Sequence, residues 1–307
     1  MRYHSRMDRD LLSHLPVILA VARRASFAAA AAELGMSPSA VSHAVRLVEE
    51  RLGVPLFART TRSVSLTEAG TALVASAEPA LRDIGERVER IRAAEGRVSG
   101  LLRLNVPSVA LPILMTPVVH EMAKRFPGVT VEIFVDDAIA NIVADGFDAG
   151  IRLGGMIAED MVAVRLTPAF KAIIVASPGY LADRGRPKSI ADLKNHNCIA
   201  YRQIKSGGLY RWELLSEGRE TTIEGNGNSI VNNALYAREL ALAGIGLAYL
   251  FEPLVRADIA AGCLSQVLPK SAIEEPGLFI YYPRRAAMAP KLRAFIDTAI
   301  DVLRKKK

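Results

Sequence analysis

The chain has 307 residues, of which 50% are hydrophobic and 23% are charged, and its formal net charge is +7. This length exceeds one comfortable hydrophobic core and predicts two domains, while the composition excludes an extended disordered or low-complexity protein. The net charge is poor evidence for nucleic-acid binding, because residues 1–100 carry 14 arginines against 11 acidic residues and the four residues 304–307 supply four more positive charges. Residues 101–303 are close to neutral.

The cysteines and the hydrophobic runs indicate the compartment. Cys198 and Cys263 lie far apart without a C-x-x-C spacing, which predicts free thiols in a reducing environment. The apolar run of residues 11–22 imitates a signal peptide, but Asp8 and Asp10 stand where a basic segment belongs. No stretch reaches the roughly 18 apolar residues that span a bilayer. We therefore expect a cytoplasmic protein without a membrane partner.

The first fifty residues contain a helix-turn-helix pattern. Residues 11–24 repeat apolar side chains at helical spacing and predict a first helix. Ser26 is placed to cap a second, alanine-rich helix, which Gly35 ends in a left-handed conformation. Ser37 caps a third helix with Pro38 at its first position, where the missing N–H costs nothing. The sequence thus predicts two helices joined by a tight turn.

Three positions make this pattern specific. Ala31 is small enough for a close crossing of the helices, Gly35 permits the turn, and Val41 supplies a branched apolar wedge. The side of the third helix opposite Val41 is polar, and we interpret it as the face that contacts bases and phosphates, with a solvated face of an ordinary bundle as the alternative. The residues of this face are Ser39, Ser42, His43 and Arg46.

The segment after this helix is expected to form a wing. Residues 57–66 predict two short strands around a basic turn, which would lay Arg59 and Arg62 on phosphates or in the adjacent minor groove. A plain surface hairpin is the alternative. The complete set of predicted DNA contacts is Ser26, Ser37, Pro38, Ser39, Ser42, His43, Arg46, Arg59, Thr60 and Arg62.

A long helix follows, capped by Thr67. Its apolar residues alternate steps of three and four between charged residues, which is the heptad spacing of a coiled coil, although packing against its own domain would give a similar stripe. We interpret the stripe as a dimer seam, expect a kink at Pro79, and infer a roughly two-fold operator. The predicted seam residues are Val74, Ala77, Leu81, Ile84, Val88 and Ile91.

Several motifs resemble those of the LysR-type transcriptional regulators. They are residues 26–42, 47–57, 59–62 and 66–70, and in the second half residues 146–152, 206–212 and 244–248. One departure lies on the recognition helix, where His43 and Ala44 stand in place of the Arg-Gln pair of many members; it concerns the operator sequence, not DNA binding. The predicted parts are a winged helix-turn-helix domain (8–66), a linker and dimerisation helix (67–96), an effector-binding domain (97–303), and disordered ends (1–7 and 304–307).

The rest of the chain predicts an α/β fold. Expected strands are residues 101–106, 129–135, 149–153, 171–176, 247–250 and 278–282, and expected helices are residues 111–125, 231–243 and 290–303. In such sheets ligands bind beyond the carboxyl ends of strands, often at a helix N-terminus. Two segments are expected to leave a strand and enter a helix in this way, residues 106–109 and residues 225–229.

The resemblance implies that this domain is similar to a periplasmic solute-binding protein, with two α/β subdomains around an effector cleft. Their expected ranges are 97–168 with 272–303, and 169–271. The resemblance implies that the cleft is lined by Ser108, Asp136, Arg152, Tyr201, Arg202 and Ser229. An arginine fork would suit a carboxylate effector, whereas surface ion pairs are the alternative for Arg152 and Arg202, and Asp136 argues against a strongly anionic ligand.

Catalytic motifs are lacking. His196 and Cys198 have no second pair of metal ligands, the glycines at 244 and 246 lack the third glycine of a dinucleotide fingerprint, and there is no G-x-S-x-G or H-E-x-x-H. We expect no enzyme, metal or cofactor. The resemblance implies a regulator that binds double-stranded DNA as a dimer or tetramer, responds to a small molecule and has RNA polymerase as a further candidate partner. The alternatives are a solute-binding or enzymatic α/β protein with an accessory DNA-binding domain, and an architectural DNA-bending protein.

Overall fold

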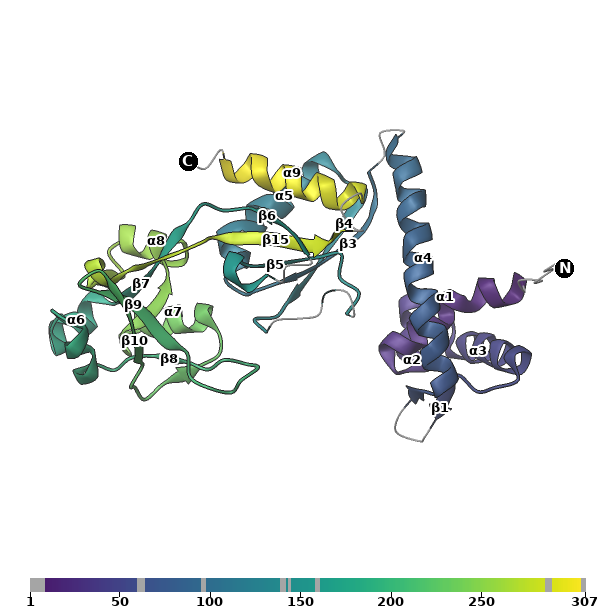
Figure 1. Ribbon diagram of the computed structural model, residues 1–307, viewed down its shortest axis with the longest axis horizontal. Coiled ribbons are helices and arrows are strands. Elements are labelled where there is room, and N and C mark those ends of the chain that lie inside the picture. The colour runs from purple at the N-terminus through teal and green to yellow at the C-terminus, as the bar shows by residue number, and fades with distance from the viewer. Residues whose placement is uncertain are drawn as a thin grey trace. The chain divides into compact units, whose positions relative to one another are not determined.

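The computed structural model describes residues 9–59, 64–94, 98–138, 142, 145–157, 161–284 and 289–304 (Figure 1). The chain divides into two compact units, residues 1–88 and 89–307. No helix among the described residues is long and apolar enough to cross a membrane. Of the ends expected to be disordered, Arg304 is the last residue of a helix, and residues 1–7 and 305–307 lie outside the described part of the chain.

Three short helices begin the N-terminal unit. They are α1 (Arg9–Arg24), α2 (Phe27–Leu34) and α3 (Pro38–Leu52). The Ser26 side chain accepts the N–H of Ala29 at 3.3 Å, and the Ser37 side chain accepts that of Ala40 at 3.2 Å. Gly35 ends α2 with a φ of 64°, in the left-handed region that favours glycine. The predicted caps and turn are therefore confirmed.

Small and branched side chains let these helices cross at close range. Ala31 of α2 and Val41 of α3 are both 0% exposed, as is Ile18 of α1. The inward face of α3 is completed by Ala44, Val45 and Val48, which are also buried. This single core fixes the direction in which the opposite face of α3 points.

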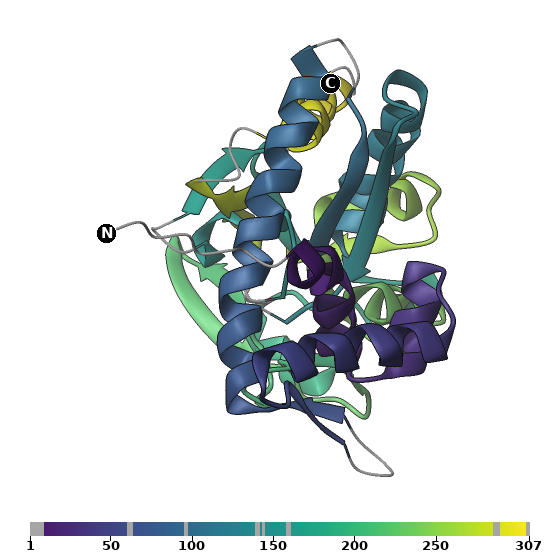
Figure 2. The ribbon, with the colours of Figure 1, turned by 90° about the vertical axis from the view of Figure 1, so that its right-hand side faces the viewer.

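A two-stranded hairpin follows α3. Strands β1 (Phe57–Arg59) and β2 (Val64–Leu66) are antiparallel, which confirms the predicted pair of strands. Residues 60–63, which connect them, lie outside the described residues. Figure 2 shows the hairpin beside the first turn of the long helix α4 (Glu68–Ala94). Gly70 makes this approach possible, because a Cβ there would lie 2.1 Å from the carbonyl oxygen of Leu56.

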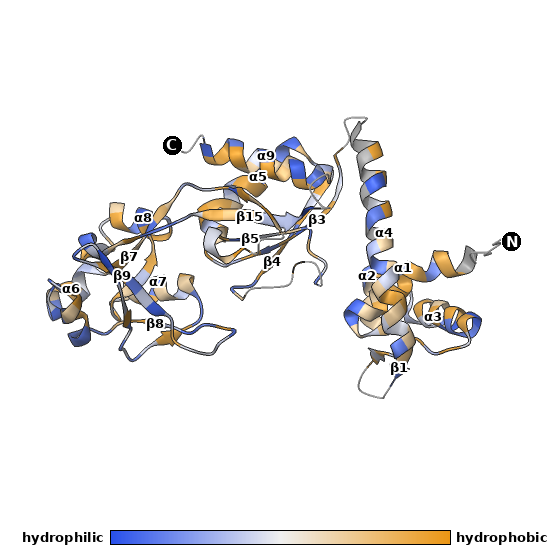
Figure 3. Cartoon of the chain, viewed as in Figure 1, coloured by the Kyte–Doolittle hydropathy of each residue, from blue (hydrophilic) through white to orange (hydrophobic). Residues whose placement is uncertain are grey.

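The hydrophobic stripe of α4 divides into two parts. Val74, Ala77 and Leu81 pack against α1 of the same unit, around Leu15 and Leu19. Further along the helix, three apolar residues are exposed: Ile84 (57%), Val88 (40%) and Ile91 (68%). Figure 3 shows hydrophobic and hydrophilic bands alternating along α4. At Pro79, where a kink was expected, the helix continues without interruption. The first half of the predicted seam thus has its own module as a partner, which the heptad spacing alone did not reveal.

The first half of the C-terminal unit is a five-stranded sheet. Its strands are β3 (Gly100–Val106), β4 (Val129–Val135), β5 (Ala149–Leu153), β6 (Met161–Arg165) and β15 (Leu278–Pro283), in the order β4-β3-β5-β15-β6. Its helices are the π-helical turn η1 (Leu111–Met115), α5 (Thr116–Arg125), the short η2 (Gly154–Met156) and α9 (Pro290–Arg304). The helices α5 and α9 lie side by side (Figure 1) and share one buried core with the sheet, including Leu104 and Phe295.

The second half is built around strand β7 (Phe170–Ala176). β12 (Ala248–Phe251) pairs with one edge of β7, and β13 (Ser265–Val267) and β14 (Ile273–Glu275) pair with the other. The other elements are α6 (Pro178–Arg184), η3 (Ile190–Asn195), β8 (Ala200–Tyr201), β9 (Arg211–Ser216), β10 (Arg219–Glu224), β11 (Ile230–Val231), α7 (Ala234–Leu242), α8 (Glu252–Ala260) and η4 (Pro269–Ser271).

Two chain crossings connect the halves, one from β6 to β7 and one from β14 to β15. They are bonded to each other: Leu278 donates its N–H to the Thr167 Oγ1 at 2.8 Å, and its carbonyl oxygen accepts the N–H of Leu166 at 2.9 Å. Gly277 has a φ of 87°, and a Cβ there would lie 2.5 Å from the carbonyl oxygen of Pro168. The two crossings therefore form one close-packed junction.

The expected strands of both halves are present, and the α/β prediction is confirmed. One expectation was wrong: residues 225–229 do not enter a helix. Strand β11 intervenes, and α7 begins only at Ala234, where the Asn233 side chain accepts the N–H of Tyr236 at 3.0 Å as the N-cap. The β9-β10 hairpin was not predicted.

Candidate DNA-binding surface and effector site

The outer face of α3 is polar and accessible. Ser39, His43 and Arg46 are exposed and Ser42 is half-buried, while the opposite face lies in the core. Arg46 has an ion pair with Glu50 one turn later, at 3.7 Å. The pair is exposed and therefore weak, so the guanidinium remains available to a phosphate. The structure brings these four predicted contacts to one face of one helix.

Ser37 and Pro38 begin the helix that carries this face, and Ser26 begins the preceding helix, α2. Ser26 and Ser37 each use the hydroxyl oxygen to accept a backbone N–H of the following helix. The Ser37 Oγ also lies 3.0 Å from the Oγ of Ser39, and Pro38 is exposed at the first position of α3. A hydroxyl that accepts one bond keeps its own hydrogen, which is the group that a phosphate oxygen would accept.

Glu49 attaches the hairpin to α3. Its Oε1 accepts the N–H of Leu56 at 2.8 Å and that of Phe57 at 3.1 Å. Its Oε2 lies 3.5 Å from the guanidinium of Arg59, which also lies over the ring of Phe27, 4.3 Å from the centroid. Arg59 thus has partners within its own module, an arrangement that the sequence did not suggest. The other wing contacts, Thr60 and Arg62, lie outside the described residues.

A cavity of about 370 Å³ lies between the two halves of the C-terminal unit. Three of the six predicted effector residues line it: Ser108 and Arg152 from the first half and Tyr201 from the second. Burial and the nearby charge of Asp137 raise the pKa of Tyr201 to about 12. The tyrosine therefore stays protonated at neutral pH and is a hydrogen-bond donor as well as an acceptor.

Asp137 holds the polar end of this cavity. One of its carboxylate oxygens accepts the N–H of Ser108 at 2.7 Å, and the other accepts the Ser108 hydroxyl at 2.8 Å. These are the donors that the sequence predicted for a ligand at the end of the first strand. In the structure a carboxylate of the chain itself occupies them.

Arg152 is 3% exposed, and its guanidinium is bonded mainly to backbone. Nη1 donates to the carbonyl oxygen of Ile151 at 2.6 Å; Nη2 donates to the Asn105 Oδ1 at 2.6 Å and the Ala138 carbonyl oxygen at 2.6 Å, and lies 3.2 Å from that of Asp136. Nε has no partner among the described residues. Burial lowers the pKa of Arg152, against the raising effect of nearby charges. The guanidinium clamps the loop after β4 to β3 and β5.

The other three predicted effector residues do not line the cavity. The Asp136 carboxylate accepts the N–H of Ala138 at 2.8 Å, which bends the loop after β4. Arg202 is exposed and donates to the carbonyl oxygen of Gly207 at 2.6 Å. Ser229 lies 3.1 Å from the Oδ1 of its neighbour Asn228. Neither guanidinium forms, with any described residue, the surface ion pair that was the alternative for the two arginines.

Three stacked aromatic rings also line the cavity. Tyr249 is stacked with Tyr210, at 6.3 Å between ring centroids, and with Trp212, at 5.6 Å. Glu275 lies in the same lining, and its carboxyl group has no hydrogen bond or ion pair to any described residue. Burial, together with the charge of Glu213, raises the pKa of Glu275. The cavity therefore combines an unpaired carboxyl group with stacked aromatic faces.

Two family models together match most of the chain. One, described as the bacterial regulatory helix-turn-helix protein of the lysR family, matches residues 12–71, and the other, the LysR substrate binding domain, matches residues 95–304. The chain belongs to the LysR family of transcriptional regulators. This confirms the family resemblance and the fold class, a helix-turn-helix domain joined to a LysR-type effector-binding domain.

Individual relatives of this LysR-type regulator match along nearly its whole length. It is 37% identical over 286 residues to the uncharacterized HTH-type transcriptional regulator YcaN of Escherichia coli, covering 93% of each chain. It is 36% identical over 291 residues to the HTH-type transcriptional regulator PgrR of Escherichia coli, covering 95% of this chain and 97% of the relative.

Solved structures share the fold of this LysR-type regulator. CrgA, a LysR-type transcriptional regulator from Neisseria meningitidis, has a TM-score of 0.62 and 28% identity, with 95% of this chain and 98% of that chain covered. The Vibrio cholerae virulence activator AphB has a TM-score of 0.59 and 22% identity, with 94% of this chain and 98% of that chain covered.

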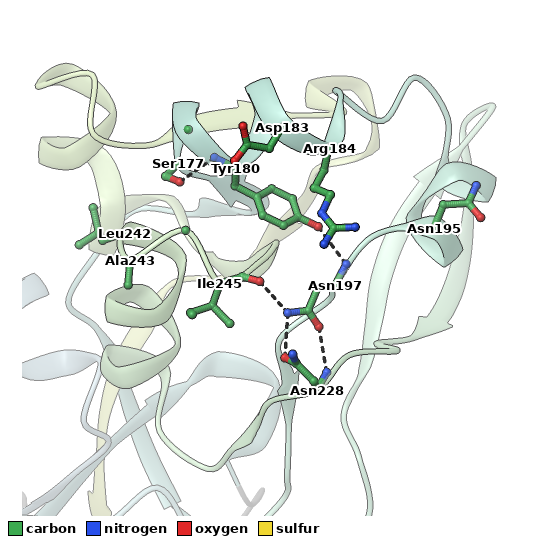
Figure 4. Close-up of a pocket in the computed structure, with 12 residues that line it drawn as sticks. Ser177, Tyr180, Asp183, Arg184, Asn195, Asn197, Asn228, Leu242, Ala243 and Ile245 are labelled. Atoms are coloured by element: carbon green, nitrogen blue, oxygen red, sulfur yellow. Dashed lines mark hydrogen bonds between the residues drawn. The ribbon is translucent and has the colours of Figure 1, made fainter.

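A second concavity in this regulator, of about 760 Å³, lies beside α6 and is polar (Figure 4). The Asn197 side chain donates to the Ile245 carbonyl oxygen at 2.6 Å and to the Asn228 Oδ1 at 2.9 Å, and accepts the Asn228 N–H at 2.8 Å. The Tyr180 hydroxyl accepts the N–H of Asn197 at 2.9 Å and lies 3.2 Å from the Nδ1 of His196. These side chains bond to one another, so the concavity joins three loops and we assign no ligand to it.

The residues weighed as catalytic candidates have structural surroundings. His196 packs against Tyr180, and burial raises the pKa of the Cys198 thiol to about 11, which keeps it protonated at neutral pH. Cys263 is exposed. Among the described residues, no group of three or more His, Cys, Asp or Glu side chains is arranged to hold a metal ion.

Proposed function

We propose that this LysR-type regulator binds operator DNA by inserting α3 into the major groove, with the β1-β2 hairpin beside it on the phosphate backbone. The observation that carries the proposal is the outer face of α3, where Ser39, His43 and Arg46 are exposed above a fully packed core. A recognition helix contacts base edges with residues near its N-terminus, which is where these side chains lie. Glu49 supports the same reading, because it holds the wing at a fixed position relative to α3.

The proposed DNA-binding form is a dimer joined along the second half of α4. Ile84, Val88 and Ile91 follow heptad steps and are exposed on the isolated chain, which favours burial against a second copy. Two copies would present two recognition helices to a two-fold operator. A tetramer of two such dimers, a contact with RNA polymerase and a cytoplasmic location belong to the same proposal, as do the domain limits 8–66, 67–96 and 97–303.

The cavity between the two halves of the C-terminal unit is the proposed effector site. Its lining comes from both halves, so a ligand held there contacts both. A ligand changes DNA binding only if its affinities for the two arrangements of the protein differ. A ligand that contacts both halves would bind with different affinity when the halves rotate relative to each other about their junction.

Footprinting of the purified full-length protein on the DNA upstream of its own gene tests the DNA-binding part. A protected region with roughly two-fold symmetry is expected at moderate salt, and random DNA of equal length and composition is the control. Absence of any protected region would overturn the regulator proposal.

A further inference from the structure

The cavity between the halves has two chemically different ends, and their polar groups indicate which ligand charge it accepts. At Ser108 the hydrogen-bond donors are already used by a carboxylate of the chain itself. Both donors are bonded to Asp137, at 2.7 and 2.8 Å. A ligand carboxylate placed there would compete with a bound carboxylate and meet its negative charge, at a cost in free energy.

Arg152 does not offer a carboxylate site either. Both of its Nη atoms donate to oxygens of the chain, and a two-oxygen anion is held well only where two parallel N–H groups are free. The remaining unpartnered group is Nε, a single buried N–H. One donor suits one neutral oxygen, such as a hydroxyl or carbonyl group of a ligand.

The aromatic end has the opposite character. Glu275 is half-buried in the lining, its carboxyl group has no hydrogen bond or ion pair to any described residue, and Glu213 lies close enough to influence its ionisation. The rings of Tyr210 and Tyr249 line the same cavity, and aromatic rings attract cations that lie over a ring face within about 6 Å of its centre. Carboxylate and aromatic faces together form an environment that stabilises an ammonium group.

Besides Asp137, Arg152 and Glu275, the lining contains one more charged residue, Lys205, which is exposed on the loop between β8 and β9. Its charge is screened by solvent, whereas that of Glu275 is partly shielded from solvent. The electrostatic balance inside the cavity is therefore set by the glutamate and not by the lysine.

We propose that the effector cavity selects an organic cation, an amine whose charged nitrogen lies at Glu275 and whose apolar body lies against Tyr210 and Tyr249. The proposal rests on the proposed effector function of the cavity and specifies its ligand class. It replaces the carboxylate effector expected from the sequence.

Three compounds that share the phenylethyl group but differ in charge test whether the cavity selects a cation. They are 2-phenylethylamine, 3-phenylpropionate and 2-phenylethanol, each added to the full-length protein while thermal unfolding is followed. Only the amine is expected to raise the melting temperature, by about 3 °C at a concentration tenfold above its Kd. The amine shift should disappear in Glu275→Gln and remain in Glu274→Gln, since Glu274 is exposed and outside the cavity lining.

Each other result overturns the assignment. A larger shift with 3-phenylpropionate or 2-phenylethanol would leave the effector cavity in place but reject the cation. An amine shift that persists in Glu275→Gln would place the amine elsewhere. If no probe shifts the melting temperature, the amine class is rejected, and footprinting of the same preparation shows independently whether the protein is a DNA-binding regulator.

Discussion

The carboxylate of Glu49 lies 3.5 Å from the guanidinium of Arg59, and this pair links helix α3 to the β1-β2 hairpin. The same carboxylate also accepts two backbone N–H groups at the start of the hairpin. Glu49 of α3 therefore fixes the position of the β1-β2 hairpin that follows it in the chain.

Glu49→Gln should weaken both DNA binding and the stability of the N-terminal unit. An amide keeps one acceptor oxygen but loses its charge, and charge-assisted bonds contribute about 1.5–3 kcal/mol, so we expect a loss of about 1–2 kcal/mol in urea unfolding. Glu50→Gln is the matched control, because Glu50 is exposed and, among the described residues, its carboxylate pairs with Arg46 alone. Equal effects of the two substitutions would contradict the proposed anchoring of the wing.

Arg46→Ala and Ser42→Ala should affect DNA binding in different ways. Loss of one phosphate contact should weaken binding to all DNA and reduce the slope of log K against log salt by about 0.9. Loss of the Ser42 hydroxyl should mainly change base preference and leave the salt slope unchanged. Fluorescence anisotropy on operator and random duplexes over a salt series separates the two effects. Identical behaviour of both variants on both duplexes would refute the division.

Ile84→Asp combined with Val88→Asp should convert the dimer into monomers. The two side chains are exposed on the isolated chain, so charges there disturb an interface without entering the module core. Light scattering measures the mass, and Asp83→Asn, an exposed change on the same turn, is the control. Leu81 is unsuitable for this test because it packs against α1. A dimer that survives both aspartates would show that another surface joins the copies.

Arg152→Met should destabilise the C-terminal unit even without a ligand. The change removes the guanidinium donor of the Asn105 side chain and of the carbonyl oxygens of Asp136, Ala138 and Ile151, at a cost of about 1–3 kcal/mol. Arg202→Met, which removes one exposed bond to Gly207, should change the free energy of unfolding by less than about 0.5 kcal/mol. Chemical unfolding of the two variants makes the comparison, and a neutral Arg152→Met would contradict the clamp.

The stability of the protein should depend on the ionisation of Glu275. Burial and the charge of Glu213 raise its pKa above the usual 4.5. A carboxyl group with a raised folded pKa favours folding while it is protonated, and this contribution is lost as the pH rises through the folded pKa. Glu275→Gln should therefore unfold at a higher temperature than the parent protein at pH 7, with the difference vanishing below about pH 4. Melting curves across this range check the sign, and Glu274→Gln should show no such trend.

The N-terminal unit could be predicted from the sequence because its signals are local. Caps at Ser26 and Ser37 and the left-handed Gly35 act on their own neighbours, so spacing alone predicts the helices. The division of the α4 stripe could not be predicted, because exposed and packed heptad positions have the same spacing and differ only in what lies opposite them.

The lining of the cavity was predicted in part. Ser108, Arg152 and Tyr201 do line the cavity, but Asp136 was expected where Asp137 lies, since the sequence does not show which of two adjacent acids turns toward the cavity once the strand has ended. Glu275 was missed because it joins the cavity through β14, far along the chain. The alternation of polar and apolar residues in Arg211–Leu214 is a local sequence signal that would have revealed strand β9, which carries Trp212 of the lining.

The junction of Thr167, Gly277 and Leu278 has a mechanical consequence. Both connections between the halves pass through it, and the bonds between Leu278 and Thr167 keep the two from separating. We therefore expect opening and closing of the cavity to be mainly a rotation about this line, with little sliding. Glu275 lies two residues before Gly277, close to this axis. A ligand held at Glu275 would therefore bind beside the axis, where a small displacement corresponds to a large rotation of one half relative to the other.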